Sequence, residues 1–434
     1  MTKQDIIQAA FRAWGRSYYK LTSLSDVARE LGVSKPALYR HFCSKQALLD
    51  AMYDSFLNDY TVRLKDDYKL AMEVTDRREA LFIVVRAIIG YFARNVNGFI
   101  FALIYVYGAE RRGNTGELLL GRGVDMGIFD RFLKGTPPQA VMSTFAFSMA
   151  YFHRLGRPGG TAAGDEEPSK QEIDREISLV YCIISHGIGF QKEEIEVLDY
   201  EALERQVLQT SVRIEENELL HAVAKAVAGA GIGDVSMKMV ARVSGLSKSG
   251  LYAHFKNKQD MLVQLFVTEF DRIIDFAENS MKGSAVTAER LYLMIFAICD
   301  YLRSRPDILI ALDWLRTRRL TPLATTDLSA DKPEDKRVPF RLYRIFRDIQ
   351  PSPELREYLQ DTREDWIPAW ILFMLVNSTV QGGWGGGAFS EWPMAPKGPK
   401  GRLFRRDFSR IPNESFRILY RFIVRGIQEF TPQG

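Results

Sequence analysis

The amino-acid sequence predicts an all-α protein made of two tandem units, each a three-helix head followed by a helical bundle. One observation is an internal repeat: residues 23–49 align without a gap to residues 236–262, and fourteen of the 27 positions are identical. Such self-similarity marks a duplicated structural unit. The other observation is periodicity, because apolar residues recur at helical spacing along the chain and no segment alternates as a half-buried strand would.

The composition is that of an ordinary folded protein. Of the 434 residues, 46% are hydrophobic and 26% are charged, which argues against a disordered or fibrous chain. The length suggests two to four domains. Three cysteines, far apart and odd in number, give no disulfide framework, so we expect a cytoplasmic protein. The most apolar run, 98–109, is shorter than the roughly 20 residues that span a bilayer, so no membrane segment is expected.

Within each copy, the residues indicate two short helices joined by a tight turn. Gly32 and Gly245 end the first of these helices, since glycine adopts the left-handed conformation of a helix end at little cost. Val33 and Leu246 are expected to fill the angle between the helices. Serines occupy the N-cap positions of both helices, Ser23 and Ser34 in the first copy and Ser236 and Ser247 in the second. A preceding helix at 3–16 or 215–229 completes a helix-turn-helix head.

Positive charge is concentrated in the two repeated segments. Residues 1–49 hold eight Lys or Arg and three Asp or Glu, a net charge of +5, and residues 219–262 hold six and two, a net of +4. The whole chain carries +4, so the rest carries about −5. Two cationic helix-turn-helix segments are typical of contact with the phosphates of double-stranded DNA. The predicted domains are 1–49 (head 1), 50–210 (body 1), 211–262 (head 2) and 263–434 (body 2).

The repeated motif resembles the DNA-binding segment of the TetR family of repressors. The resemblance is carried by a Gly-Val-Ser or Gly-Leu-Ser turn, then Leu-Tyr-Arg-His-Phe at 38–42 or Leu-Tyr-Ala-His-Phe at 251–255, then Lys45 or Lys258. It implies a recognition helix that enters the major groove, and a helical body that binds a small-molecule effector. Members of the family usually carry one head and act as homodimers, so two heads in one chain depart from the pattern.

The resemblance assigns the DNA contacts by position. In head 1 they are Ser23, Ser34, Lys35, Pro36, Ala37, Tyr39, Arg40 and Lys45, and in head 2 they are Ser236, Ser247, Lys248, Ser249, Gly250, Tyr252 and Lys258. Tyr39 and Lys45 resemble the family's phosphate-binding tyrosine and lysine, whereas His41 and Phe42 are expected to pack the head. Arg40 could bond a guanine edge, a contact worth roughly 1–3 kcal/mol of discrimination; the aligned alanine in head 2 cannot.

This difference predicts an operator of two unlike half-sites. The alternative is that Arg40 only touches phosphate, since phosphate contacts outnumber base contacts. A second alternative is that one or both heads are degenerate and the chain is a scaffold or protein-interaction module. The intact lysines and tyrosines of both copies favour a sequence-specific transcriptional regulator, expected to be a ligand-responsive repressor; activation is the other possibility.

Both bodies are expected to be helical bundles. Expected helices lie at 45–73, 76–96, 98–112, 115–134, 137–155, 170–190 and 192–210 in body 1, and at 258–282, 286–304, 306–319, 337–349, 353–362, 364–383 and 413–430 in body 2. By the family resemblance, the last two of each body form a four-helix interface. The simplest arrangement pairs the two bodies of one chain as a pseudo-dimer, with an effective concentration of about a millimolar. A homodimer with four heads is the alternative.

Aromatic side chains on the central helices are candidates for an apolar effector pocket, although core packing is the alternative role for each. The candidates are Phe99, Tyr105, Trp314 and Trp370. Charged residues inside or beside apolar runs could meet a polar group of the effector or form ion pairs in the core; they are Arg86, Arg94, Asp300 and Asp313. The five histidines lack the spacing of metal ligands, and no catalytic triad or nucleotide fingerprint is present. We therefore expect no metal, no cofactor and no enzymatic activity.

Overall fold

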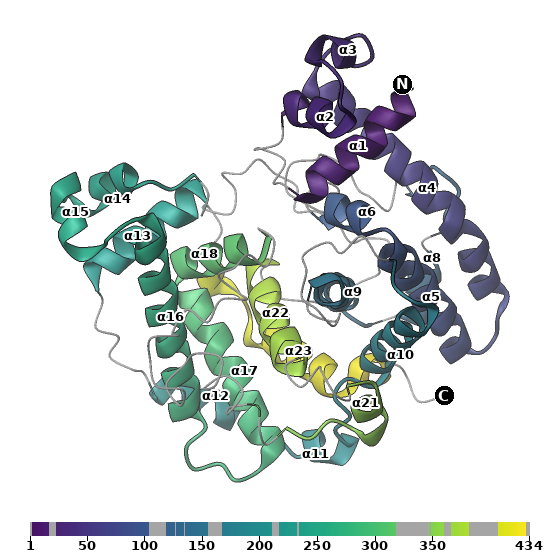
Figure 1. The fold of residues 1–434 in the computed structure, drawn as a ribbon. Helices are drawn as coiled ribbons and strands as arrows, with labels where there is room; N and C mark the ends of the chain where they lie inside the picture. Colours follow the sequence, from purple (N-terminus) through teal and green to yellow (C-terminus); the bar gives the residue numbers. More distant parts are fainter. Residues whose placement is uncertain are drawn as a thin grey trace.

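The computed structural model of the chain describes residues 2–16, 23–103, 119–125, 127–133, 135–154, 167–210, 217–231, 234–317, 346, 349–359, 366–381 and 407–430. Every regular element in these ranges is helical, which confirms the predicted all-α class (Figure 1). None of the helices described there is both long and apolar enough to span a membrane.

The first unit begins with a head of three short helices, followed by a body. The head holds α1 (Lys3–Arg16), α2 (Leu24–Leu31) and α3 (Lys35–Tyr39). The body holds α4 (Lys45–Glu73), α5 (Arg77–Arg94), α6 (Val96–Phe101), α8 (Gly127–Phe132), α9 (Pro138–Arg154) and α10 (Lys170–His186). Helix α4 begins and ends where the periodicity predicts, because Ser44 caps its first turn by accepting a hydrogen bond from the backbone N–H of Ala47.

The second unit repeats this order. Its head holds α13 (Glu218–Ala230), α14 (Met237–Ser244) and α15 (Lys248–His254). Its body holds α16 (Lys258–Ser280), α17 (Thr287–Ser304), α18 (Pro306–Thr317), α21 (Pro353–Tyr358), α22 (Trp366–Gln381), η5 (Phe408–Arg410), α23 (Asn413–Arg425) and η6 (Gly426–Glu429). Figure 1 shows the two heads at the outer ends of the molecule, with the two bodies meeting between them.

Each head joins its body in the same way. Helix α1 packs against α6, and α13 packs against α18; the long helices α4 and α16 then pack against α5 and α17. In the first unit the ring of Phe11 meets the ring of Phe101 edge-on, with centroids 5.1 Å apart. The head is therefore anchored by its first helix as well as by the long helix that follows its recognition helix.

The two bodies meet through α9 and α10 of the first unit and α21, α22, α23 and η6 of the second. The expected interface segments 170–190, 364–383 and 413–430 lie there. The expectation for 192–210 is wrong: it divides into α11 (Lys192–Glu196) and α12 (Tyr200–Gln209), and α12 packs against α17 of the second unit. Asp199 starts this new helix by accepting the N–H of Ala202. In the interface between the two bodies, the position expected for 192–210 is occupied by α9, which packs against α22.

The ends of α10 and α23 touch through a reciprocal pair of glycines. Gly187 and Gly426 each follow the last residue of their helix, and both have φ of +61°. A Cβ on Gly187 would lie 2.6 Å from the carbonyl carbon of Val424, and one on Gly426 would lie 2.6 Å from that of Ser185. Beside them the N–H of Ile188 donates to the carbonyl of residue 423 at 2.9 Å. Only glycine lets the two backbones approach this closely.

Polar side chains are also buried where α9 meets α22. The indole N–H of Trp370 donates to the hydroxyl of Thr144 at 3.2 Å, and the amide of Asn377 donates to the hydroxyl of Ser143. Buried polar groups need such partners, because leaving one unpaired costs about 1–3 kcal/mol. These bonds join the two units side chain to side chain and constrain how α9 and α22 align.

Candidate nucleic-acid interface

Local hydrogen bonds fix the helix-turn-helix of head 1. The hydroxyl of Ser23 accepts from the backbone N–H of Asp26 at 3.3 Å, and the Asp26 carboxylate accepts from the N–H of Ser23 at 2.7 Å. The N–H and the hydroxyl of Ser23 both donate to the Asp26 carboxylate, and these two bonds hold the pKa of Asp26 below its usual value. Gly32, at φ of +66°, ends α2 by donating its N–H to the carbonyls of Ala28 and Arg29. Helix α3 thereby starts at a defined angle to α2.

Head 2 is built in the same way, except at the residue after the turn and at the N-cap of the recognition helix. Ser236 caps α14 by accepting the N–H of Met239, and Gly245 ends that helix at φ of +71°. The expectation that Leu246 fills the angle between the helices is wrong, since 40% of this side chain is exposed. The aligned Val33 does pack, half-buried, against the core.

The serines before the recognition helices behave differently in the two heads. Ser247 caps α15 by accepting the N–H of Gly250 at 2.9 Å. Ser34 occupies the N-cap position of α3 but makes no side-chain capping bond, contrary to expectation. Pro36 has no N–H to donate, and the N–H of Ala37 donates instead to the backbone carbonyl of Ser34 at 3.0 Å.

Both recognition helices present the same lysine–tyrosine pair to solvent. The ammonium of Lys35 lies 5.9 Å from the centre of the Tyr39 ring, and that of Lys248 lies 5.9 Å from the ring of Tyr252. The tyrosines are 46% and 48% exposed. An exposed phenol beside an ammonium suits a phosphate oxygen, because both groups donate hydrogen bonds.

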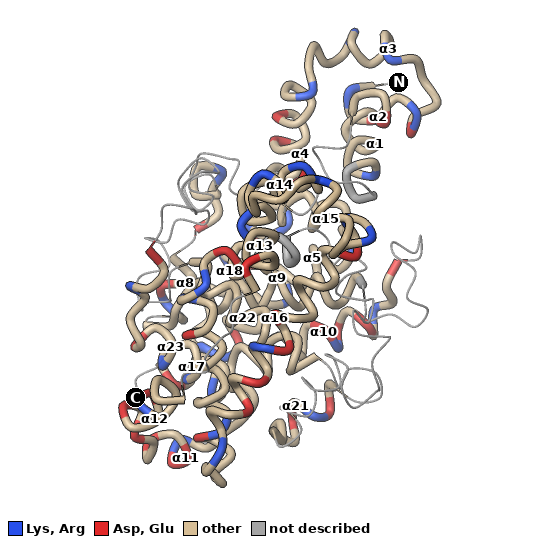
Figure 2. Tube along the Cα trace, turned by 90° about the vertical axis from the view of Figure 1, so that its left-hand side faces the viewer, with Lys and Arg blue, Asp and Glu red and all other residues tan. Residues whose placement is uncertain are grey.

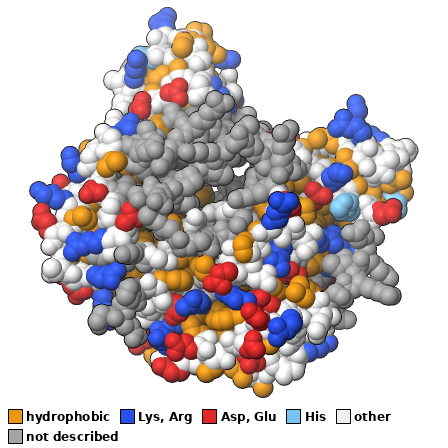
Figure 3. All heavy atoms as spheres, turned by 180° about the vertical axis from the view of Figure 1, so that it is seen from behind, with side chains coloured by type: hydrophobic (Ala, Val, Ile, Leu, Met, Phe, Trp, Pro, Cys, Tyr) orange, Lys and Arg blue, Asp and Glu red, His pale blue; other side chains and the backbone are white. Residues whose placement is uncertain are grey.

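The other candidate DNA contacts lie on or beside the same surfaces. The exposed ones are Ser23, Ser34, Pro36, Arg40 and Ser249, and the half-buried ones are Ala37, Lys45, Ser236, Gly250 and Lys258. Phe42 and Phe255 are buried, as expected of residues that pack the head, whereas His41 is half-buried and His254 is exposed. The tips of both heads carry Lys and Arg side chains (Figure 3).

The candidate pocket residues are only partly described. Phe99 is buried, with its ring 5.7 Å from the rings of Phe92 and His153. Trp370 is fully buried where the two bodies meet. Tyr105 and the side chain of Trp314 lie outside the described residues. A ligand-contacting role for any of these residues stays a prediction.

The charged residues in apolar runs have partners within the protein. Arg86 pairs with Asp67 at 3.2 Å, and Asp300 pairs with Arg303 at 2.7 Å. The guanidinium of Arg94 donates to the carbonyl of residue 90 at 2.9 Å. The side chain of Asp313 lies outside the described residues. Of these bonds, the pair of Asp300 with Arg303 is largely buried and matches the alternative of ion pairs in the core, whereas Arg86 and Arg94 are exposed.

Both bodies share a tyrosine–carboxylate contact that was not expected from the sequence. The hydroxyl of Tyr91 donates to Asp59 at 2.9 Å, and that of Tyr301 donates to Glu269 at 2.7 Å. Each bond ties the long helix after the recognition helix to the next helix of its body. Burial raises the pKa of both tyrosines, which therefore stay protonated donors. The signal available beforehand for Glu269 was a carboxylate on an otherwise apolar helix face, whereas Asp59 lies on an exposed face and gave no such signal.

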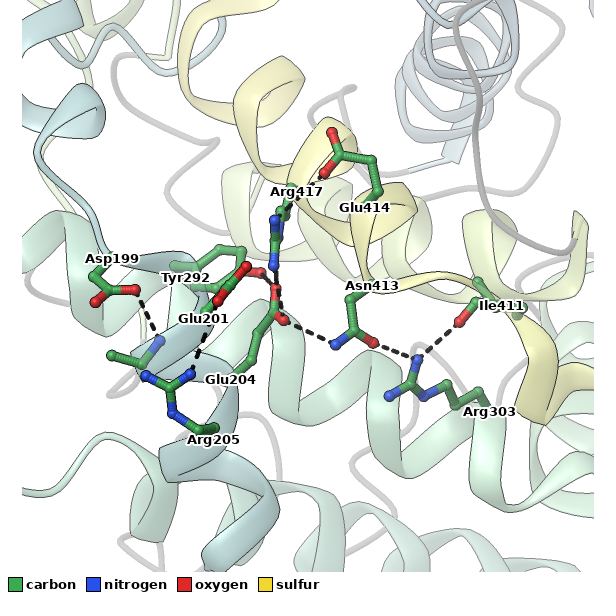
Figure 4. Close-up of polar contacts among 11 residues, drawn as sticks. Asp199, Glu201, Glu204, Arg205, Tyr292, Arg303, Ile411, Asn413, Glu414 and Arg417 are labelled. Atoms are coloured by element: carbon green, nitrogen blue, oxygen red, sulfur yellow. Dashed lines mark hydrogen bonds and ion pairs between the residues drawn. The ribbon is translucent and has the colours of Figure 1, made fainter.

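A second cluster that was missed holds α12 onto the second body (Figure 4). The carboxylate of Glu204 accepts hydrogen bonds from Tyr292 at 2.6 Å, Asn413 at 2.8 Å and Arg417 at 2.7 and 3.0 Å. Burial acts to raise the pKa of Glu204, but these bonds outweigh it and hold the pKa below its usual value. The segment before head 2 is thereby fixed to α17 and α23.

No cluster of three or more His, Cys, Asp or Glu side chains suited to a metal ion occurs in the described part of the chain. The candidate interface therefore consists of the two heads, each with exposed hydrogen-bond donors on a short helix held by a capped turn. The geometry is that of a helix that can be presented to the major groove.

Comparison with known proteins identifies both heads. The family model "Bacterial regulatory proteins, tetR family" matches residues 6–52 and again residues 219–265. The "Fatty acid metabolism regulator protein" of Bacillus subtilis (strain 168) is 28% identical over 78 residues, 18% of this chain and 40% of that protein. The "Uncharacterized HTH-type transcriptional regulator YhgD" of the same organism is 26% identical over 86 residues, 20% and 45% of the two chains. The chain thus spans less than half the length of these curated relatives.

Solved structures give weaker overall similarity. The transcriptional regulator FadR from Bacillus subtilis, in complex with stearoyl-CoA, aligns with a TM-score of 0.31 at 19% identity, over 47% of this chain and 96% of that one. FadR from Bacillus halodurans aligns with a TM-score of 0.28 at 14% identity, over 47% and 97%. The two DNA-binding heads of the chain thus belong to the TetR family of bacterial regulatory proteins, and they occur as a tandem of two TetR-type units.

Proposed function

We propose that this chain is a ligand-responsive repressor that reads an operator of two unlike half-sites with its two heads. The observation that carries the proposal is the difference between two otherwise matched recognition surfaces. Arg40 is an exposed guanidinium at the end of α3, whereas the aligned Ala253 offers only a methyl group. The flanking lysine–tyrosine pairs are the same in both heads.

In this proposal the two units pair within one chain. The packing of α9 against α22 and of α10 against α23, and the hydrogen bond from Trp370 to Thr144, support such a pseudo-dimer. The covalent connection makes the pairing intramolecular, so it does not depend on protein concentration. The domain limits 1–49, 50–210, 211–262 and 263–434 are part of this proposal.

The effector would act on the distance between the heads. A small molecule that binds one arrangement of the bodies better than another shifts the population toward it, and the operator affinity changes by the same coupling free energy. Phe99 and Trp370 are the described candidates for contact with an apolar effector. Since a relative is named for fatty acid metabolism, a fatty acid is the first effector to test.

The test is selection of bound fragments from the source genome by the purified full-length chain at a stated salt concentration, since affinity for DNA depends strongly on salt. We expect an enriched motif of two unlike half-sites at least one helical turn apart. A palindromic motif would contradict the pairing of unlike heads, and no enrichment, with and without fatty acid, would favour the scaffold alternative.

Substitutions in head 1 distinguish residues that recognise bases from residues that bind phosphate. Tyr39→Phe and Lys45→Ala should weaken binding to all sequences alike, because phosphates carry no sequence. Arg40→Ala should remove preference at one base pair, a loss of roughly 1–3 kcal/mol of discrimination. If Arg40→Ala leaves every base preference unchanged, Arg40 touches phosphate only and the argument for unlike half-sites fails.

A further inference from the structure

The recognition helix of head 2 has little capacity to hydrogen-bond base edges. The hydroxyl of Ser247 caps the helix, and the hydroxyl of Ser249 lies 2.9 Å from it. This hydrogen bond holds the Ser249 side chain toward the turn before the helix. Gly250 has no side chain, and Ala253 has no donor or acceptor. The polar side chains that remain exposed are Lys248 beside the Tyr252 ring, a pair suited to phosphate, and His254 at the last position of the helix. Direct readout in the major groove needs donors and acceptors on side chains that reach the bases.

Head 2 carries its positive charge on a different helix from head 1. Helix α2 contains one arginine, Arg29, and two carboxylates, Asp26 and Glu30, for a net charge of −1. Helix α14 contains Lys238 and Arg242 and no carboxylate, for a net charge of +2. Both cations of α14 are exposed. Figure 2 shows basic positions along α14 beside α15.

In head 1 the carboxylates of α2 pair with nearby arginines. Glu30 binds Arg12 of α1 at 3.1 Å, and Asp26 binds Arg29 at 3.1 Å. At an offset of 213, the residues of head 2 that align with these two carboxylates are Val243 and Met239. The cations aligned with Arg12 and Arg29 are Lys225 and Arg242, and the positions that hold their carboxylate partners in head 1 are apolar in head 2.

A residue in the segment between the recognition helix and the long helix after it changes in the same direction. Head 1 has Cys43 where head 2 has Lys256, and Lys256 is exposed. Head 2 has thus lost the guanidinium of the recognition helix and gained cations on both sides of it. A broad field of cations with few base-reading groups binds the DNA backbone without regard to sequence.

We propose that the two heads divide the work: head 1 selects the sequence through α3, and head 2 anchors the chain to the phosphate backbone through α14 and α15. This rests on the proposed function, because it assumes that both heads meet one operator. The second half-site is then defined mainly by its distance from the first. The selected motif should therefore contain one strongly preferred and one weakly preferred half-site, which is the extreme case of two unlike half-sites. The ligand of head 2 is the backbone of double-stranded DNA.

The first experiment substitutes each base pair of the selected operator in turn and measures the affinity of the full-length chain. Base pairs facing head 1 should include some whose substitution weakens binding by roughly 5- to 150-fold, as expected for a lost specific contact. Every substitution facing head 2 should change affinity by less than about 3-fold. Equal losses at both half-sites would overturn the division of work and leave the proposed function intact, whereas absence of specific binding would refute the proposed function itself.

A gain-of-function variant makes the comparison sharper. Ala253→Arg places at the exposed end of α15 the guanidinium that head 1 carries, and it should create a base preference of roughly 5- to 150-fold under head 2. The matched variant Arg40→Ala should flatten the preference under head 1. A strong preference under head 2 in the unmodified chain, lost in Ser249→Ala, would show that head 2 already reads bases and would overturn the proposal.

Salt dependence tests the anchoring role of α14. The log of the affinity falls linearly with the log of the salt concentration, and each lost phosphate contact makes this slope less steep by about 0.9. Lys238→Ala/Arg242→Ala should therefore make the slope less steep by roughly 1.8, and it should weaken binding to all sequences alike. The control Lys192→Ala/Arg205→Ala removes the same charge from α11 and α12, on the bodies (Figure 1), and should leave the slope nearly unchanged. Equal slopes for the two double variants would contradict a phosphate contact at α14.

Discussion

Alanine at either glycine of the junction between the two bodies should separate them. Gly187→Ala puts a residue with a side chain at φ of +61° and ψ of −144°, a region nearly restricted to glycine, at a cost of about 1–3 kcal/mol. The new Cβ would also lie 2.6 Å from the carbonyl carbon of Val424, so the helix ends must move apart. That movement breaks the bond between Ile188 and Ile423 and its neighbour from Gly189 to Val424, each worth about 1 kcal/mol. The expected loss is about 3–5 kcal/mol.

Denaturant unfolding followed by tryptophan fluorescence measures this loss, because Trp366 and Trp370 are buried in α22. Gly426→Ala should lose a similar amount, since its Cβ meets the backbone of α10 in the reciprocal way. Gly187→Ala/Gly426→Ala should lose less than the sum, because both changes disrupt one contact.

Gly283→Ala is the matched control. Gly283 also has a positive φ, +89°, but a Cβ there would meet nothing within 4 Å. Its cost is therefore backbone strain alone, about 1–2 kcal/mol. If Gly187→Ala costs no more than Gly283→Ala, the two backbones do not approach each other in solution, and the reasoning from close contact is refuted.

Further predictions concern pH and the heads. Because hydrogen bonds hold the pKa of Glu204 below its usual value, its stabilising contribution is present at neutral pH and is lost as the pH falls below the ordinary glutamate pKa and through the lowered pKa of the folded state. Glu204→Gln should unfold about 1–3 kcal/mol more easily at pH 7, with a smaller loss of stability on acidification; equal pH dependence of both proteins would contradict the contact. Ser247→Ala should destabilise head 2 by about 1 kcal/mol in thermal unfolding, whereas the aligned Ser34→Ala should cost less, since Ser34 makes no side-chain cap. Equal effects of the two changes would argue against the difference in capping.

What could be predicted from the sequence was local or repeated. The ends of α4 and the turn at Gly32 followed from caps and periodicity, and the second head followed from the first by the offset of 213 residues. The two recognition helices emerged at the expected positions for the same reason. Leu246 was misjudged because an apolar side chain next to a turn gives no sign of its direction, and alignment with Val33 implied a burial that the structure does not show.

What could not be predicted depends on contacts between distant segments. The range 192–210 has the apolar spacing of one helix, but Asp199 starts a new helix, and the partners of Glu204 lie 88 to 213 positions along the chain. Gly187 and Gly426 look like ordinary glycines after helices; their meeting is visible only once α10 and α23 are placed together. In head 1, the pairing of Glu30 with Arg12 and of Asp26 with Arg29 could not be predicted without the fold, although the charges of these residues are evident from the sequence.

The central claim is that one chain supplies both heads to one operator. Mass measurement of the complex between the full-length chain and a duplex that carries the selected operator tests it most directly. The account predicts one chain per duplex, with no change in stoichiometry as protein concentration rises from well below to well above the dissociation constant. Two chains per duplex at all concentrations would contradict it and would favour the four-headed homodimer.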